Sequence, residues 1–334
     1  MTAERLAELL ARFQRLRIAV VGDLFLDQWF HIDPALDEPS VETGLTAWQV
    51  TRMAASPGAA GTVLNNLRAM GVGRLYAVGF TGEDGTGWQL RQLLTQQGVD
   101  TAHVQAVSER MTPAYMKPMF HREGRLEEGN RLDVKNRLPT PVWVEDRLIA
   151  SLEALAPQVD AIIALDQLTE VDTGVVTARV RQELALLKQK YPSLILFADS
   201  RARIAQFRGV VIKCNRSEAA AALGAELPLA QTMERFAALT GRPVFITLGA
   251  DGIASGAGTV SPAARQAGPI DICGAGDATT AALVCGLCAG AAPREAAQLG
   301  NLSAGVTVRK VGTTGTASQA EMLALYHEQF EERI

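Results

Sequence analysis

The chain has 334 residues, of which 48% are hydrophobic and 20% charged, and its formal net charge is −4 at neutral pH. This balance fits a globular protein and gives no support for a nucleic-acid partner, because such proteins carry basic surfaces. Residues 2–16 have the apolar spacing of an amphipathic helix rather than that of a signal peptide. No uncharged apolar run reaches the roughly 18 residues that a membrane span needs. We therefore expect a cytoplasmic protein with no membrane partner.

Short apolar segments alternate with helical patterns along the chain, which predicts an α/β fold. Strands are expected at residues 17–21, 74–79, 160–165, 194–198, 210–213 and 243–247. Helices are expected at residues 61–70, 86–97, 175–191, 232–240, 276–291 and 294–308. Several strands lack polar residues at alternate positions, as is typical of strands that are covered on both faces. The order of these elements predicts a doubly wound, mainly parallel sheet.

Two segments, near residues 23–50 and 111–136, interrupt this alternation. In the second, polar and apolar residues alternate from Tyr115 to Phe120 and a turn at Glu123-Gly124 follows, which indicates a β-hairpin. Strands inserted near the ends of sheet strands would form a small β-lid over the crevice where α/β proteins bind ligands. Ordinary surface loops are the alternative. Because no linker is evident, we expect residues 1–334 to form a single domain that carries this lid.

The segment with the most chemical content is Asp-Ile-Cys-Gly-Ala-Gly-Asp at residues 271–277, directly before a predicted helix. Gly274 and Gly276 allow a tight turn, and the first amides of a helix are free donors that attract anions. Phosphoryl transfer requires such a site, and Asp277 could accept the proton of an attacking hydroxyl. The alternative is a tight turn before a buried helix, stabilised by Asp277. The segment fits neither a Walker A loop nor a dinucleotide-binding G-x-G-x-x-G.

This segment resembles the second signature of the PfkB, or ribokinase-like, carbohydrate kinases, D-T-x-G-A-G-D, with Ile272 in place of the usual Thr. Other family landmarks stand in the family's order, so that the resemblance spans roughly residues 17–316: G-D-L-F-L-D at 22–27, P-G-A-A-G at 57–61, N-R-S-E at 215–218, T-L-G-A-D-G at 247–252, Asn301, and K-V-G-T at 310–313. The first and last of these, with Arg131-Leu132-Asp133, are closest in style to the bacterial D-glycero-D-manno-heptose-7-phosphate kinase group.

The resemblance implies a ribokinase-like kinase that uses ATP and Mg²⁺ to phosphorylate a hydroxyl of a sugar or sugar phosphate, with heptose 7-phosphate as one candidate acceptor. It implies that Asp277 is the catalytic base and that the turn of Gly274, Ala275 and Gly276 holds the moving phosphoryl group. Two alternatives stay open. One is a kinase for an unphosphorylated sugar or a nucleoside, such as fructose, ribose or adenosine. The other is a non-catalytic sugar or nucleotide sensor on the same fold.

On the sugar side, the resemblance implies that Asp27 binds sugar hydroxyls, with Asp23 as a weaker candidate, although either carboxylate could instead serve a turn. Gly58 and Ala59 stand where the family has two glycines, and Thr62 stands where it usually has an Asn. Because both positions belong to the sugar pocket of the family, Ala59 and Thr62 leave the identity of the acceptor sugar open. Lys117 belongs to a group of basic lid residues that could bind a phosphate on the sugar. A solvated surface with interleaved acidic residues is the alternative.

On the nucleotide side, the resemblance implies that Asn215 and Glu218 organise Mg²⁺ and phosphate, with Glu218 acting directly or through water. The same pair also fits a helix capping box. The remaining nucleotide positions implied by the family are Thr247, Gly249, Gly252 and Asn301. Asp271 matches a monovalent-cation site, which would hold K⁺. A homodimer through the lid is expected, because open strand edges favour pairing with a second copy.

Overall fold

The computed structural model describes residues 1–122 and 124–330. Its central sheet has nine strands in the order β16-β15-β14-β13-β12-β11-β1-β6-β7, and all neighbours are parallel except β14/β15 and β15/β16. The predicted doubly wound, mainly parallel sheet is therefore confirmed. The strands are β1 (Arg17–Gly22), β6 (Arg74–Gly82), β7 (Val99–Val107), β11 (Ala161–Asp166), β12 (Ile195–Ser200), β13 (Val211–Asn215), β14 (Val244–Thr247), β15 (Ile253–Ser255) and β16 (Thr259–Ser261).

Helices cover both faces of this sheet, and each face has its own hydrophobic core. In β1, Ile18 and Val20 point into one core while Ala19 and Val21 point into the other, as the two-residue period of a strand requires. The first core is closed by α1 (Ala3–Arg12), α2 (Ala60–Ala69), α3 (Gly85–Gln96), α8 (Ala275–Cys288), α9 (Pro293–Thr307) and α10 (Gln319–Phe330). The second is closed by α4 (Val142–Leu155), α5 (Ala178–Lys190), α6 (Arg216–Leu223) and α7 (Leu229–Thr240).

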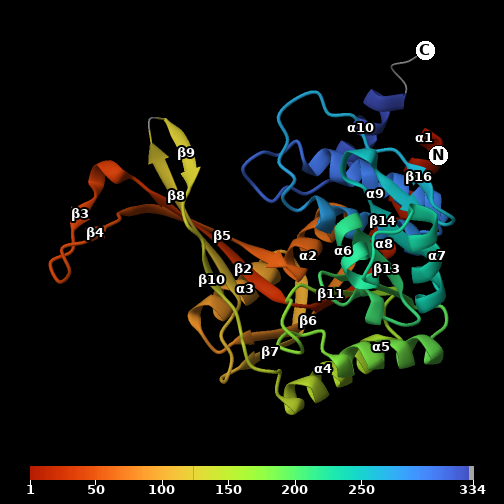
Figure 1. Cartoon of the computed structure of the whole chain (residues 1–334), viewed down its shortest axis with the longest axis horizontal. Helices are drawn as coiled ribbons and strands as arrows, with labels where there is room; N and C mark the ends of the chain where they lie inside the picture. Colours follow the sequence, from red (N-terminus) through yellow and green to blue (C-terminus); the bar gives the residue numbers. More distant parts are fainter. Residues whose placement is uncertain (123, 331–334) are drawn as a thin grey trace.

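The two segments that interrupt the alternation form a second sheet together with residues 51–59, which extend the first segment beyond its expected end, and this sheet projects from the α/β body (Figure 1). Its strand order is β10-β8-β2-β5, and β9 pairs with β8 in the hairpin expected there. Glu123 in the expected turn lies outside the described residues. The strands are β2 (Leu24–Ile32), β5 (Val50–Ala59), β8 (Ala114–Arg122), β9 (Arg125–Glu128) and β10 (Leu132–Val134); β3 (Glu38–Pro39) and β4 (Thr46–Ala47) form a separate hairpin. We call β2–β5 and β8–β10 the lid.

The lid is anchored where β1 runs into β2. Between them, the buried Asp23 accepts hydrogen bonds from the backbone N–H groups of Gln167, Leu168 and Val175, at 2.8–3.2 Å. This carboxylate therefore ties the start of the lid to the loop that follows β11. Short 3₁₀ turns complete the chain: η1 (Phe13–Arg15), η2 (Pro34–Leu36), η3 (Ile204–Gln206) and η4 (Gly249–Asp251). Within residues 1–122 and 124–330, we find no helix that combines the length and apolar character of a membrane span.

Candidate active site

A cavity of about 240 Å³ opens at the carboxyl ends of the central strands, beside the start of α8. This is the edge of a parallel sheet where ligands bind in α/β proteins. It brings together residues from five strand ends or loops and two helices. Its lining consists of Leu165, Asp166, Gln167, Asp199, Arg201, Lys213, Asn215, Glu218, Thr247, Gly274, Gly276 and Asp277. Half of these residues were expected from the sequence, on both the catalytic and the nucleotide side.

The turn before α8 has the geometry of an anion site. Gly274 adopts φ +77°, a left-handed conformation that favours glycine, and α8 begins at the next residue. The Ala275 N–H donates to the carbonyl of Ile272 at 3.2 Å. Ala275, expected to contribute an amide, therefore serves the turn instead. The N–H groups of Gly276 and Asp277 remain in the first helical turn, where a helix offers no backbone acceptor, so these two amides can hold an anion.

Asp277 is half-buried at the cavity. Desolvation, followed by the charge of Asp199, raises the pKa of Asp277 to about 7, although Lys213 and Arg201 oppose this rise. Asp199 itself forms an ion pair with the buried Lys213 and accepts a hydrogen bond from Thr280 Oγ1 at 2.9 Å. A carboxylate whose pKa lies near neutrality is suited to accept a proton at physiological pH.

Asn215 and Glu218 form a capping box at the start of α6 and also line the cavity. The Glu218 N–H donates to Asn215 Oδ1, and the Asn215 N–H donates to Glu218 Oε2, both at 2.8 Å. Burial raises the pKa of Glu218. Asn215 and Glu218 can therefore cap α6 and also contact a ligand, because the cap fixes two side chains that still line the cavity.

A second cavity, of about 370 Å³, adjoins the first and shares Asn215 and Thr247 with it. Its lining consists of Asn215, Arg216, Ser217, Glu226, Thr247, Leu248 and Gly249. Thr247 and Gly249, both expected on the nucleotide side, therefore lie together.

The two other residues expected on this side are not part of either lining. Gly252 lies in the turn before β15, and its carbonyl accepts from the Leu248 N–H at 2.8 Å. Asn301 is buried in α9, and its Nδ2 donates to the carbonyls of Ser261 and Pro262 at 2.7 and 3.0 Å. Asn301 therefore holds the segment after β16 in place.

On the lid, Asp27 has a buried carboxylate oxygen, Oδ1, with no hydrogen-bond partner in the described part of the chain. Burial raises the pKa of Asp27, and the charges of Lys117 and Arg131 oppose that rise. Gly58 lies on the neighbouring strand β5, diagonal to Asp27, and a Cβ there would come within 2.7 Å of Asp27 Oδ2, so only glycine leaves room for this carboxylate. A buried carboxylate oxygen without a donor suits a site for ligand hydroxyls.

Other residues expected at the sugar side surround this point. Ala59 adopts φ +52° and ψ −116° at the start of α2, a strained conformation for a residue with a Cβ. Thr62 is buried in α2, and its methyl carbon lies near Gly274, 3.7 Å from where a Cβ of that glycine would be. Asp23 is only 3% exposed, and its carboxylate is occupied by three backbone N–H groups. This geometry gives Asp23 a structural role instead of a contact with sugar.

Basic residues of the lid lie beside Asp27. Lys117 Nζ is 5.4 Å from the centre of the Trp29 ring, and no ion pair of its own is found among the described residues. Arg131 stacks over Tyr115, at 4.1 Å from the ring centre, and binds Asp133 with two hydrogen bonds of 2.6 and 2.9 Å. Of the two lid cations whose charges act on Asp27, Lys117 therefore has no carboxylate partner among the described residues, and Arg131 is partly neutralised.

Asp271 connects two loops near α8. Its carboxylate accepts from the N–H groups of Cys273 and Gly312 at 2.9 and 3.0 Å, and its own N–H donates to the Val308 carbonyl at 2.8 Å. Of the residues described, no three His, Cys, Asp or Glu side chains cluster as a metal site. The carboxylates at the cavity nevertheless fit Mg²⁺, since this ion is commonly held by one or two carboxylates, waters and substrate phosphates.

Several cavity residues were missed from the sequence, notably Asp199, Arg201 and Lys213. The available signal was their position. Asp199 directly follows the predicted strand 194–198, Arg201 directly follows the observed strand β12, and Lys213 lies two residues before Asn215. Polar residues at the carboxyl ends of parallel strands are placed to face a ligand.

Residues 204–320 match the family model described as pfkB family carbohydrate kinase. The bifunctional protein HldE of Trichlorobacter lovleyi is 30% identical over 100% of this chain and 68% of its own length. That of Desulfatibacillum aliphaticivorans is 29% identical over 95% of this chain and 64% of its own length. The chain thus spans about two thirds of the length of these relatives.

Two solved structures have the same fold. The structure of phosphofructokinase-2 from Escherichia coli in complex with potassium has a TM-score of 0.71 and 17% identity, and the match covers 94% of this chain and 99% of that one. The structure of Arabidopsis thaliana ribokinase complexed with ribose and ATP has a TM-score of 0.66 and 16% identity, over 93% and 98% of the two chains.

Proposed function

The chain belongs to the pfkB family of carbohydrate kinases, and within that family we propose that it phosphorylates a sugar that already carries a phosphate, with heptose 7-phosphate as the leading acceptor. The observation that carries the proposal is the proximity of Asp277 to Asp27 of the lid. Desolvation is the main cause that raises the pKa of Asp277, and the charge of Asp27 adds to it. The two carboxylates therefore lie close enough for their charges to interact, which supports a site that the base and the hydroxyl-binding carboxylate share.

In this mechanism, Asp277 orients the acceptor hydroxyl and takes its proton. The hydroxyl oxygen forms a bond to the γ-phosphorus of ATP, while the bond from that phosphorus to the bridging oxygen breaks and its electron pair leaves with ADP. The N–H groups of Gly276 and Asp277 stabilise the charge on the moving group. When bound, Mg²⁺ would neutralise phosphate charge, and Glu218 and Asn215 would hold it, with Glu218 acting directly or through water.

The lid supports a phosphorylated acceptor. Asp27 and Gly58 would receive the sugar hydroxyls, and Lys117 would bind the acceptor's phosphate, since its ammonium group has no carboxylate partner among the described residues. Arg131 lies on the same side of Asp27 but is partly neutralised by Asp133. Ala59 and Thr62, which depart from the family pattern, would adapt the pocket to the acceptor.

We further propose ATP as the donor, bound along Thr247 and Gly249, with Gly252 and Asn301 supporting this edge from behind. K⁺ would bind near Asp271, beside carbonyls of the loops that this carboxylate joins. The working form would be a cytoplasmic homodimer that pairs through the lid.

The acceptor is tested by measuring ADP release with heptose 7-phosphate, fructose 6-phosphate, fructose, ribose and adenosine. We expect the highest kcat/KM for heptose 7-phosphate. We also expect Lys117→Ala to raise the KM for it by about tenfold or more, as for loss of a charged phosphate contact, with little change for unphosphorylated sugars.

Two outcomes would contradict this function. A higher kcat/KM for an unphosphorylated sugar or for adenosine would favour a kinase of the fructose, ribose or adenosine type. Calorimetric binding of one of these ligands without any ADP formation would favour a sensor. The control for Lys117→Ala is Lys190→Ala, which removes the same charge from an exposed position on α5.

A further inference from the structure

We propose that Arg201 binds the phosphoryl group while it is transferred, as a cation that faces Asp277 across the cavity. The inference rests on the proposed kinase function and assigns a role to a residue outside the family landmarks of the sequence. It predicts that Arg201 distinguishes ATP from ADP and acts on the chemical step.

The position of Arg201 is fixed at both ends. It directly follows β12, and its N–H donates to the Asp166 carbonyl at 3.1 Å. At the other end, Nη2 and Nε donate to the amide oxygen of Gln167 at 2.7 and 3.0 Å, in the amide orientation that satisfies both groups. Gln167 is held in turn, because its N–H donates to Asp23 at 2.9 Å. The guanidinium is therefore oriented before any ligand binds.

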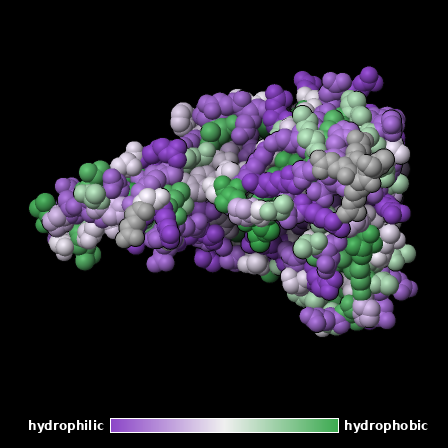
Figure 2. Space-filling view, turned by 90° about the horizontal axis from the view of Figure 1, so that it is seen from above, coloured by the Kyte–Doolittle hydropathy of each residue, from purple (hydrophilic) through white to green (hydrophobic). Residues whose placement is uncertain are grey.

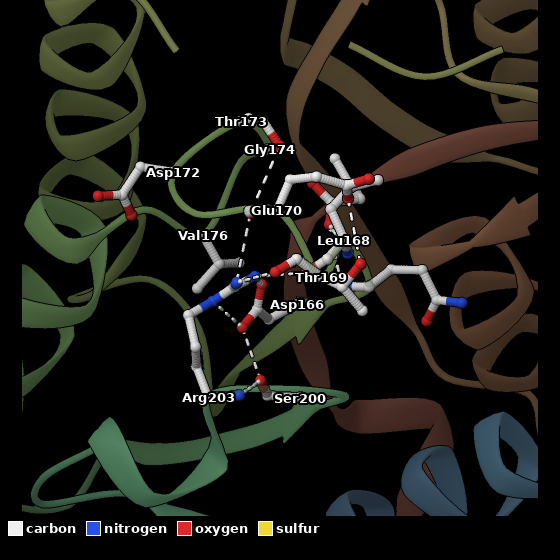
Figure 3. A network of polar contacts seen from close by, with 12 residues as sticks. Asp166, Leu168, Thr169, Glu170, Asp172, Thr173, Gly174, Val176, Ser200 and Arg203 are labelled. Carbon is white, nitrogen blue, oxygen red and sulfur yellow. Dashed lines mark hydrogen bonds and ion pairs between the residues drawn. The ribbon is translucent and has the colours of Figure 1, made fainter. Parts of the chain in front are cut away.

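A buried ion pair stiffens the loop that carries Gln167 (Figure 3). Arg203 donates through Nε to Asp166 at 3.0 Å and through Nη1 to the carbonyl of Thr169 at 3.1 Å. Ser200 Oγ adds a hydrogen bond to the same carboxylate at 2.6 Å. Arg201 and Arg203 thus have separate tasks: the buried Arg203 holds the loop, while the exposed Arg201 lines the cavity.

The charge of Arg201 is not neutralised within the protein. In the described part of the chain, its guanidinium contacts only the neutral Gln167, whereas Lys213, also at the cavity, is paired with Asp199. Two of its five N–H donors serve Gln167, which leaves the others for a ligand. An oriented guanidinium with free donors matches the oxygens of a phosphoryl group.

Arg201 lines the same cavity as Asp277 and Glu218, the groups proposed to handle phosphate. Desolvation raises the pKa of Asp277 and of Glu218, and the charge of Arg201 opposes the rise at both carboxylates. The guanidinium is therefore near the base and near the residue proposed to organise Mg²⁺. A phosphoryl group that passes between donor and acceptor must cross this space.

The decisive experiment compares the binding of ATP and ADP to wild-type enzyme and to Arg201→Ala by calorimetry, with Mg²⁺ and without acceptor. Loss of a charge-assisted contact to the γ-phosphate is expected to weaken ATP binding about tenfold or more. ADP binding should stay within about twofold of wild type. Arg208→Ala is the matched control, because the hydrogen bonds of that exposed arginine to the described residues go to backbone carbonyls of its own turn, at Ala205 and Phe207.

Kinetics supply the second readout. With the acceptor found in the panel, Arg201→Ala should lower kcat by about a hundredfold or more, as for loss of an arginine that stabilises transition-state charge. Its KM for the acceptor should stay nearly constant, and added guanidinium should restore part of the rate. An Arg201→Lys variant should keep more activity than Arg201→Ala, because one cation remains.

Three results would overturn the proposal: unchanged ATP affinity, equal loss of ATP and ADP affinity, or an effect confined to the KM of a phosphorylated acceptor. The third would assign Arg201 to the acceptor's own phosphate. Failure of this inference is distinguishable from failure of the proposed acceptor, because the comparison of ATP with ADP requires no turnover. A melting temperature near that of wild type checks that each variant is folded.

Discussion

The ionisation of Asp277 is favoured by its place at the start of a helix and opposed by its desolvation. The first turn of α8 favours its charged form through the helix dipole, while desolvation and Asp199 raise its pKa to about 7. A base must be ionised to act, so activity should be lost as the pH falls through this value. We expect kcat/KM to fall about tenfold per pH unit below about 7 and to level off above it. The measurement is the pH profile with limiting acceptor.

The same prediction extends to Asp277→Asn, which keeps the shape of the side chain but removes its basicity. We expect kcat to fall about 10²- to 10⁴-fold, with ATP binding retained and the pH dependence near 7 abolished. Asp146→Asn provides the control, because this exposed carboxylate forms its ion pair with Arg179 on α5. A flat wild-type profile, or near-normal turnover of Asp277→Asn, would remove Asp277 from this role.

Residues of the cavity differ in how far the sequence could predict them. Asp277, Glu218 and Asn215 were found because they stand in short motifs whose spacing is local, at the starts of α8 and α6. Arg201 and Lys213 were missed, since their importance depends on neighbours such as Gln167 and Asp199 that only the folded sheet brings close. The unpaired state of a charge is a property of tertiary structure.

Among the strands of the central sheet, the apolar ones next to helices were predicted, whereas the short β15 and β16 and the more polar β7 were not. The six expected strands correspond to β1, β6, β11, β12, β13 and β14. The antiparallel β15 and β16 have three residues each, which is too short for a periodic signal. The polar residues of β7 kept this strand from being predicted, because only one face of this edge strand is well buried.

The loop between β11 and α5 is an element without regular structure that positions the cavity. It is pinned on one side by Asp23 and on the other by the buried pair of Arg203 and Asp166. Arg203→Leu would leave Asp166 buried without its cation, so we expect the free energy of unfolding to fall by about 3–5 kcal/mol. Urea denaturation monitored by circular dichroism measures this change.

Two further variants test whether the loss of stability comes from the unpaired charge of Asp166. Adding Asp166→Asn to Arg203→Leu should recover part of the loss, because the unpaired charge is then removed. Arg137→Leu removes the exposed partner of Glu170 and should cost less than about 1 kcal/mol. Equal effects of Arg203→Leu and Arg137→Leu would show that the buried pair does not hold the loop.

For the whole molecule, the projecting lid suggests how two copies would associate. Hydrophobic residues gather at the end of the projection (Figure 2), and the β3–β4 hairpin occupies that end (Figure 1). Leu45, Trp48 and Met53 are 72%, 54% and 61% exposed in the single chain. In addition, β5 is an edge strand of the lid sheet, so its outer backbone groups are open to pairing. Covering this surface is the physical reason to expect a homodimer.

We therefore expect sedimentation velocity at micromolar concentration to show a particle with the mass of two chains. Met53→Glu on β5 should shift it to one chain, because a charge at a buried contact opposes association. Trp88→Glu, at a position 62% exposed on α3 and outside the lid, should leave the dimer intact. A wild-type monomer, or equal effects of the two substitutions, would contradict association through the lid. If the dimer forms as expected, Asp27 and Lys117 lie on a sheet whose outer part is ordered by the partner, so Met53→Glu should also raise the KM for the acceptor.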